Sequence, residues 1–100
     1  MNEQFSLKKN NPLVEVVMPN YNKDQFLEEA INSVINQKYN NWKLIIIDDA
    51  SQDNSQKILK EFEKKNSNIK VVYLKKRKKA AFARNLGIRL STGKYIAFLD

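Results

Sequence analysis

Short apolar runs alternate with amphipathic segments along almost the whole chain, and this alternation limits the folds that the chain can adopt. Apolar runs typical of strands lie at residues 13–18, 43–47, 69–74 and 94–99. Between them, apolar residues recur at helical spacing over residues 22–37, 51–65 and 80–90. The run Leu44–Ile47 is apolar at every position, which is typical of a central strand buried on both faces. We therefore predict an α/β domain with a parallel sheet and right-handed crossovers.

Local signals predict where the helices begin and end. Asn22 with Gln25 resembles a capping arrangement at the start of the first helix. Ser51 or Asp53 is a candidate cap for the second helix. Gly93 follows the third helix and is a candidate left-handed cap.

Composition excludes several kinds of chemistry. The 100 residues suffice for one small domain, which we place at 12–100 after a polar lead-in at 1–11 without a secretory signal. The absence of Cys and His excludes disulfides, Cys/His zinc sites and catalysis by a Ser-His-Asp or Cys-His set. Any metal must be held by oxygen ligands, which favours Mg²⁺ or Mn²⁺. No apolar run is long enough to span a membrane, and we expect a cytoplasmic location.

The chain is basic. Its 18 Lys and Arg residues outnumber 11 Asp and Glu residues, for a net charge of +7. An excess of this size favours an anionic partner, such as a nucleic acid, phosphate groups or an acidic membrane surface. A general richness in lysine is the alternative explanation.

Polar residues follow each predicted strand. The segments concerned are Pro19-Asn20-Tyr21-Asn22, Asp48-Asp49-Ala50-Ser51, Lys75–Lys79 and Asp100. In parallel sheets, ligands bind at the carboxyl ends of the strands, so these segments are expected to line one rim. An aromatic ring, three carboxylates and a basic cluster could together stack a base, hold a metal and neutralise a diphosphate.

Each of these features also has a purely structural explanation. Tyr21 could pack at a strand end, and Asp48 or Asp49 could cap the second helix. The Lys75–Lys79 run and Arg84 could simply be solvated. Their convergence on one rim is what favours a binding site.

Other phosphate-binding classes fit less well. No strand is followed by a G-x-G-x-x-G motif, and Gly93-Lys94 lacks the earlier glycine of a P-loop. A receiver-like domain with Asp100 as phosphoacceptor stays open as an alternative, although its acidic pair would follow the first strand. A basic nucleic-acid-binding domain is a further alternative, but no aromatic residues are interleaved with the lysines.

Four segments in order carry a family resemblance: Val16-Val17-Met18-Pro19-Asn20-Tyr21-Asn22, Leu44-Ile45-Ile46-Ile47-Asp48-Asp49-Ala50-Ser51, Ala83-Arg84-Asn85-Leu86-Gly87-Ile88 and Gly93-Lys94-Tyr95-Ile96-Ala97-Phe98-Leu99-Asp100. Together they resemble the N-terminal half of inverting family 2 glycosyltransferases with the GT-A fold. The resemblance implies a three-layer α/β/α, Rossmann-like arrangement with strand order 3-2-1-4.

The resemblance also implies functions for particular residues. The nucleotide-binding set would be Pro19, Asn20, Tyr21, Asp48, Asp49, Arg84 and Asp100. Asp100 matches the first Asp of the Asp-x-Asp motif and would meet Mg²⁺ or Mn²⁺. The donor would be a nucleotide-diphosphate sugar, with UDP expected, and the acceptor a saccharide or a lipid-linked glycan. A nucleic acid is not expected as a partner, whereas peripheral contact with the cytoplasmic face of a membrane is.

The chain differs from the family in one loop and is expected to be incomplete. The family usually has a glycine-containing stretch before its Ala-Arg-Asn segment, where this chain has Lys-Arg-Lys-Lys-Ala-Ala-Phe. By the resemblance, the catalytic base and the second Asp of the metal motif lie beyond Asp100, so these residues alone are expected to be inactive. We also expect self-association through the exposed fourth strand, 94–99.

Overall fold

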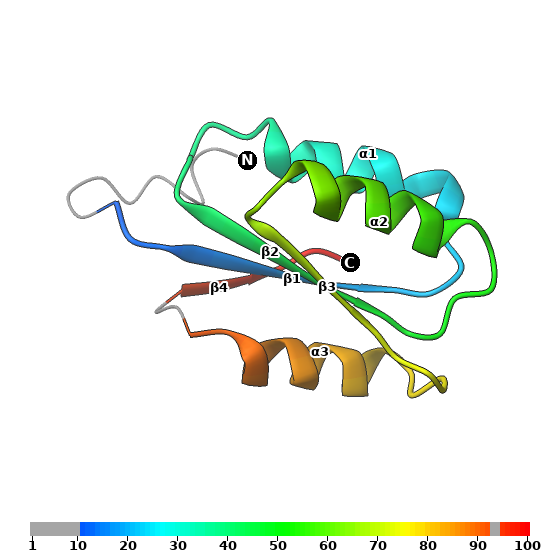
Figure 1. Cartoon of the computed structure of the whole chain (residues 1–100). Coiled ribbons are helices and arrows are strands. Elements are labelled where there is room, and N and C mark those ends of the chain that lie inside the picture. Colours follow the sequence, from blue (N-terminus) through cyan, green and yellow to red (C-terminus); the bar gives the residue numbers. More distant parts are fainter. Residues whose placement is uncertain (1–10, 93–94) are drawn as a thin grey trace.

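A computed structural model describes residues 11–92 and 95–100 and contains one four-stranded sheet (Figure 1). All its strand pairs are parallel, in the order β3-β2-β1-β4. The elements are β1 (Val14–Asn20), α1 (Asp24–Ile35), β2 (Trp42–Asp48), α2 (Ser55–Lys65), β3 (Ile69–Tyr73), α3 (Ala80–Leu90) and β4 (Tyr95–Phe98). The predicted α/β class and strand order are confirmed. The predicted lead-in (except Asn11), the Gly93 cap and the start of the fourth strand at Lys94 lie outside the described residues.

Helices cover both faces of the sheet. In Figure 1, α1 and α2 lie side by side on one face and α3 lies alone on the other. Leu44 and Ile46 of β2 belong to the larger core under α1 and α2, whereas Ile45 and Ile47 pack with Ala83 of α3. The four apolar residues of β2 are thus buried on alternating faces, as their continuous run predicts.

The register brings the carboxyl ends of the strands level. Asn20 pairs with Asp48, and Asp48 pairs with Tyr73. Beyond these pairs the backbone bonding continues, because the Asp49 N–H donates to Asn20 O at 2.9 Å and the Leu74 N–H donates to Asp48 O at 2.9 Å. The loops that follow β1, β2 and β3 therefore leave the sheet at the same edge.

β1 continues through Pro19, although a proline lacks the N–H that a central strand normally uses. Backbone groups alternate between the two neighbouring strands. Val17 O accepts from Leu99 on the β4 side, and Asn20 O accepts from Asp49 on the β2 side. The nitrogen of Pro19 therefore points to the β4 side, beyond the last β1–β4 pair, Val17 with Phe98, where no ladder donor is needed.

The predicted cap at Asn22 is wrong. α1 begins at Asp24, and the side chain of its N-cap residue, Lys23, makes no capping hydrogen bond. Asn22 has a positive φ of 50° and instead bonds to the loop before α2: its N–H donates to Ser51 Oγ (2.9 Å), and its Oδ1 accepts from the Gln52 N–H (2.8 Å). Contacts between loops about 30 residues apart in the chain thus replace the local capping arrangement.

Asp53 accepts hydrogen bonds from the first residues of two helices. Its Oδ1 accepts the N–H of Ser55, the first residue of α2, at 2.9 Å, and its Oδ2 accepts the N–H of Asp24, the first residue of α1, at 3.0 Å. Asp24 in turn accepts the Asn54 N–H at 3.1 Å. Neither of the two predicted residues is the N-cap of α2, which is Asn54; Asp53 lies one residue before it, and Ser51 bonds to Asp48.

Candidate functional site

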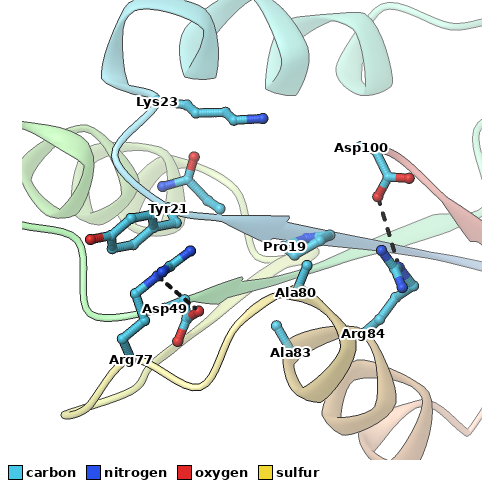
Figure 2. A pocket seen from close by; sticks show the side chains of 10 residues that line it. Pro19, Tyr21, Lys23, Asp49, Arg77, Ala80, Ala83, Arg84 and Asp100 are labelled. Carbon is cyan, nitrogen blue, oxygen red and sulfur yellow. Dashed lines mark ion pairs between the residues drawn. The ribbon is translucent and has the colours of Figure 1, made fainter.

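A pocket of about 280 Å³ lies at the carboxyl edge of the sheet, between the loop after β1 and the start of α3 (Figure 2). Its lining residues are Pro19, Asn20, Tyr21, Lys23, Asp49, Arg77, Ala80, Ala83, Arg84 and Asp100. The structure therefore brings together six of the seven predicted site residues. The seventh, Asp48, does not line the pocket.

Asp48 is completely buried beneath the loops after β1 and β2. Its Oδ1 accepts from Ser51 Oγ at 2.7 Å and from Asn20 Nδ2 at 3.0 Å. Its Oδ2 accepts from the Ser51 N–H at 3.1 Å and from Gln56 Nε2 at 3.2 Å. Four donors satisfy this carboxylate, so its place in the structure is to join the two loops rather than to face a ligand.

Asp49 points to the other side of β2 and lines the pocket while being only 3% exposed. Its two oxygens accept the backbone N–H groups of Lys78 at 2.6 Å and Lys79 at 2.7 Å. Arg77 Nε lies 3.8 Å from Asp49 Oδ2. One carboxylate therefore fixes the backbone of the basic loop immediately before α3.

Arg77 is the member of the Lys75–Lys79 run that lines the pocket, and the four lysines of the run do not. Its guanidinium carbon lies 3.7 Å from the centroid of the Tyr21 ring. In Figure 2 the guanidinium lies between the ring and the carboxylate of Asp49. Tyr21, Arg77 and Asp49 thus form a charged, aromatic end of the pocket.

Lys79, the residue before α3, lies in the loop where the family resemblance leads us to expect a glycine. Its φ of 75° and ψ of 168° lie in a region that is nearly exclusive to glycine. The hydrogen bond from its N–H to Asp49 holds this conformation. The backbone therefore takes a glycine-like path without a glycine.

The opposite end of the pocket carries Arg84 and Asp100, whose side chains form an ion pair with Nε and Oδ1 4.0 Å apart (Figure 2). The Asp100 side chain is 71% exposed. An exposed carboxylate suits Mg²⁺ or Mn²⁺, which can be bound by one or two carboxylates together with substrate phosphates. Among residues 11–92 and 95–100, however, no group of three or more acidic side chains could hold an ion alone. Asp100 thus fits as one ligand of a metal that a diphosphate would also hold.

The start of α3 also lines the pocket, although the sequence did not lead us to predict this. Ala80, the first residue of the helix, and Ala83 both line the pocket. The first turn of α3 contains no acidic residue, so its free N–H groups can favour an anion. The small side chains at these positions were a signal for a close approach of ligand to the helix. Lys23 also lines the pocket and was not predicted; its position two residues after Tyr21, in the loop after β1, was the available signal.

Known proteins resemble the chain in both sequence and structure. The family model described as Glycosyl transferase family 2 matches residues 15–100. The Escherichia coli protein named UDP-Glc:alpha-D-GlcNAc-diphosphoundecaprenol beta-1,3-glucosyltransferase WfgD is 41% identical over 88 residues, covering 88% of this chain and 34% of that protein.

Solved structures agree with this assignment. TarS 1–349 of S. aureus in complex with UDP-GlcNAc aligns with a TM-score of 0.80 and 26% identity over 87% of this chain and 26% of that one. The fold also matches the mannosyltransferase PcManGT from Pyrobaculum calidifontis, in complex with GDP-Man and Mn²⁺, with a TM-score of 0.77 at 22% identity, covering 92% of this chain and 29% of that one.

The chain spans about a third of the length of the curated relatives that it matches. Its predicted resemblance is confirmed over most of its own length, from the first strand to Asp100. The chain belongs to glycosyl transferase family 2.

Proposed function

We propose that these residues bind the nucleotide part of a nucleotide-diphosphate sugar, as the donor-binding half of a longer glycosyltransferase. The observation that carries the proposal is the single pocket shared by Tyr21, Asp49, Arg77, Arg84 and Asp100. It lies at the carboxyl ends of parallel strands, where ligands of such sheets bind. The receiver-like and nucleic-acid-binding alternatives lack this support, since the family match covers residues 15–100.

The two ends of the pocket suit different parts of a nucleotide. The Tyr21 ring can stack on a base, and the oxygens of Asp49 can accept from a base N–H in addition to the loop N–H groups. A diphosphate would lie near the start of α3 and Arg84, where positive charge and N–H groups are available. UDP is the proposed nucleotide, in keeping with the complex of UDP-GlcNAc with TarS.

Asp48 supports the site indirectly. Because it bonds Asn20 and Ser51, it fixes the loop after β1 that carries Tyr21. We propose that Asp48 is a positioning residue and that Asp49 contacts the nucleotide.

Asp100 is the proposed ligand of Mg²⁺ or Mn²⁺. A bound ion would neutralise charge on the departing diphosphate. The ion pair with Arg84 holds the Asp100 carboxylate at the pocket.

We propose that the complete enzyme transfers the sugar, with inversion, to a hydroxyl of a saccharide or a lipid-linked glycan. Inversion requires a base that deprotonates the acceptor. Asp49 is bonded to loop N–H groups on the donor side, so we propose that the base lies outside these residues and that they are inactive alone. We also propose that the enzyme acts in the cytoplasm, at the membrane surface where lipid-linked acceptors are found.

Titration with UDP in the presence of Mg²⁺, followed by ¹⁵N–¹H NMR, tests the nucleotide site. Millimolar affinity, about −4 kcal/mol, is expected for half of a donor site. Shifts should concentrate at residues 19–22, 48–51 and 77–84. Shifts that avoid the first two segments would contradict the site, and sugar transfer by this chain alone would contradict the location of the base.

Three variants make the test specific. Tyr21→Phe should retain binding because the ring does the stacking, whereas Tyr21→Ala should weaken it about tenfold. Asp49→Asn should also weaken it about tenfold, because an amide nitrogen would face backbone N–H donors. Tyr95→Ala removes an exposed tyrosine from β4, outside the pocket, and serves as the matched control.

A further inference from the structure

The positive charge of the chain is concentrated in one stretch. Residues 69–92 contain eight Lys and Arg residues and no Asp or Glu, which exceeds the net charge of +7 for the whole chain. The rest of the sequence is therefore close to neutral. A general richness in lysine would have spread the excess along the chain, so this distribution argues against that explanation.

The fold gathers this stretch on the side of the sheet that α3 covers alone (Figure 1). Lys70 of β3 pairs with Ile45, whose side chain packs with Ala83 of α3, so Lys70 points to the same side. Lys75, Lys76 and Lys78 follow in the exposed loop before α3.

An exposed aromatic ring lies among these cations. Phe82 is 44% exposed, and Lys78 Nζ lies 5.7 Å from the centroid of its ring. Arg89 lies seven residues after Phe82 and thus on the same side of the helix. Arg84 lies on the opposite side, where it pairs with Asp100. We call the set Lys70, Lys75, Lys76, Lys78, Phe82 and Arg89 the basic face.

No carboxylate neutralises this surface in the described part of the chain. The two ion pairs found there involve Arg77 with Asp49 and Arg84 with Asp100, and both lie at the pocket. The cations of the basic face are exposed and remain available for an external anion.

We propose that the basic face docks on an anionic membrane surface. Lysines around an exposed aromatic ring are typical of interfacial contacts, in which the ring enters the headgroup region and the cations meet acidic lipids. A single-stranded nucleic acid would favour several stacking rings, whereas the other aromatic residue of this stretch, Tyr73, pairs with Asp48 and packs on the opposite core.

The choice of a membrane rests in part on the proposed function, because a lipid-linked acceptor would lie in that surface. The relative WfgD is named for a diphosphoundecaprenol-linked acceptor. The basic loop that borders the pocket also belongs to this face, so docking would bring the donor site close to the lipid surface.

Co-sedimentation with vesicles tests the proposal. The protein should bind vesicles of phosphatidylcholine mixed with phosphatidylglycerol, and should not bind phosphatidylcholine alone. Added salt should weaken the binding. The triple variant Lys75→Gln, Lys76→Gln, Lys78→Gln should bind the anionic vesicles about 100-fold more weakly.

The matched control is the triple variant Lys57→Gln, Lys64→Gln, Lys65→Gln, which removes the same charge from exposed positions on α2. It should bind the vesicles as the unmodified chain does. Equal losses in the two triple variants would show attraction by net charge alone and would overturn the proposal. So would a failure of the unmodified chain to bind anionic vesicles.

Two further measurements separate the remaining outcomes. Binding of single-stranded DNA, without vesicle binding, would assign the face to nucleic acid and overturn the membrane proposal. UDP titration of the unmodified chain reports on the proposed function independently. Intact UDP binding without vesicle binding would overturn the membrane inference alone.

Discussion

The guanidinium of Arg77 stacks on the ring of Tyr21, with its central carbon 3.7 Å from the ring centroid. The guanidinium covers one face of the ring on which, under the proposed function, a nucleotide base would stack. Asp49 fixes the adjoining backbone by accepting the N–H groups of Lys78 and Lys79. The Arg77 side chain, by contrast, is 45% exposed.

Nucleotide binding is predicted to displace this guanidinium. In the free protein, the ring current of Tyr21 should shift the Arg77 Hε resonance upfield. Saturation with UDP should move it downfield, toward the position of a solvated arginine. The Arg77→Lys variant identifies the resonance by its loss. A resonance that stays upfield at saturation would show that the base does not replace the guanidinium.

Lys79→Gly is predicted to stabilise the fold. The lysine holds φ 75° and ψ 168°, where a residue with Cβ is strained by about 1–3 kcal/mol. Glycine relieves this strain but loses roughly 0.5–1 kcal/mol through the greater freedom of the unfolded chain. The free energy of unfolding in urea should rise by about 1 kcal/mol. Lys78→Gly, at a position without positive φ, removes the same charge and should lower it instead.

The two aspartates after β2 show how far the sequence could predict the site. Successive side chains of a strand point to opposite faces, so Asp48 and Asp49 had to separate. The sequence does not say which face holds the pocket. That depends on the packing of the loop at 77–79 against Asp49 and of Ser51 and Gln56 against Asp48.

The order and period of the elements were predictable because hydrophobic spacing is local. The hydrogen bonds of Asn22 could not be predicted, because its partners, Ser51 and Gln52, lie about 30 residues away in the chain. Lys79 illustrates the same limit: its residue type gives no sign of a positive φ, which the hydrogen bond to Asp49 holds in place.

Gly87→Ala is predicted to destabilise the protein although alanine favours helices. A Cβ at Gly87 would lie 2.3 Å from Val17 Cγ1 in β1, because α3 packs against the sheet there. Overpacking of this kind costs about 1–3 kcal/mol, which outweighs the helical preference of alanine. Asn85→Ala, on the exposed side of α3, should be neutral or stabilising in the same urea measurement.

Asp53 is predicted to make stability fall in acid. Its partial burial raises its pKa, but the N–H groups of Ser55 and Asp24 bond the carboxylate, and the net effect lowers the pKa below the usual 3.8. The folded state therefore binds this proton less readily than the unfolded state. The stabilisation is complete above the unfolded pKa and is lost as the pH falls through the folded pKa.

The comparison with Asp53→Asn isolates this effect. The difference in free energy of unfolding between the two proteins should be constant near neutral pH and should shrink below pH 3.8. A difference that stays constant down to the acid transition would show that Asp53 does not titrate differently in the folded state.

Self-association through β4 is the last prediction. In the described part of the chain, β4 pairs with β1 on one side and has no strand on the other. Its residues Tyr95, Ile96 and Phe98 are 43%, 37% and 47% exposed. Open apolar edges pair with other chains, so the mass measured by light scattering should rise with concentration.

Ile96→Lys places a charge on this edge and should give a monomer. Phe26→Lys replaces a 63% exposed ring on α1 and should associate as the unmodified chain does. A clean monomer at high concentration would contradict the prediction, and equal loss of association in both variants would place the contact elsewhere.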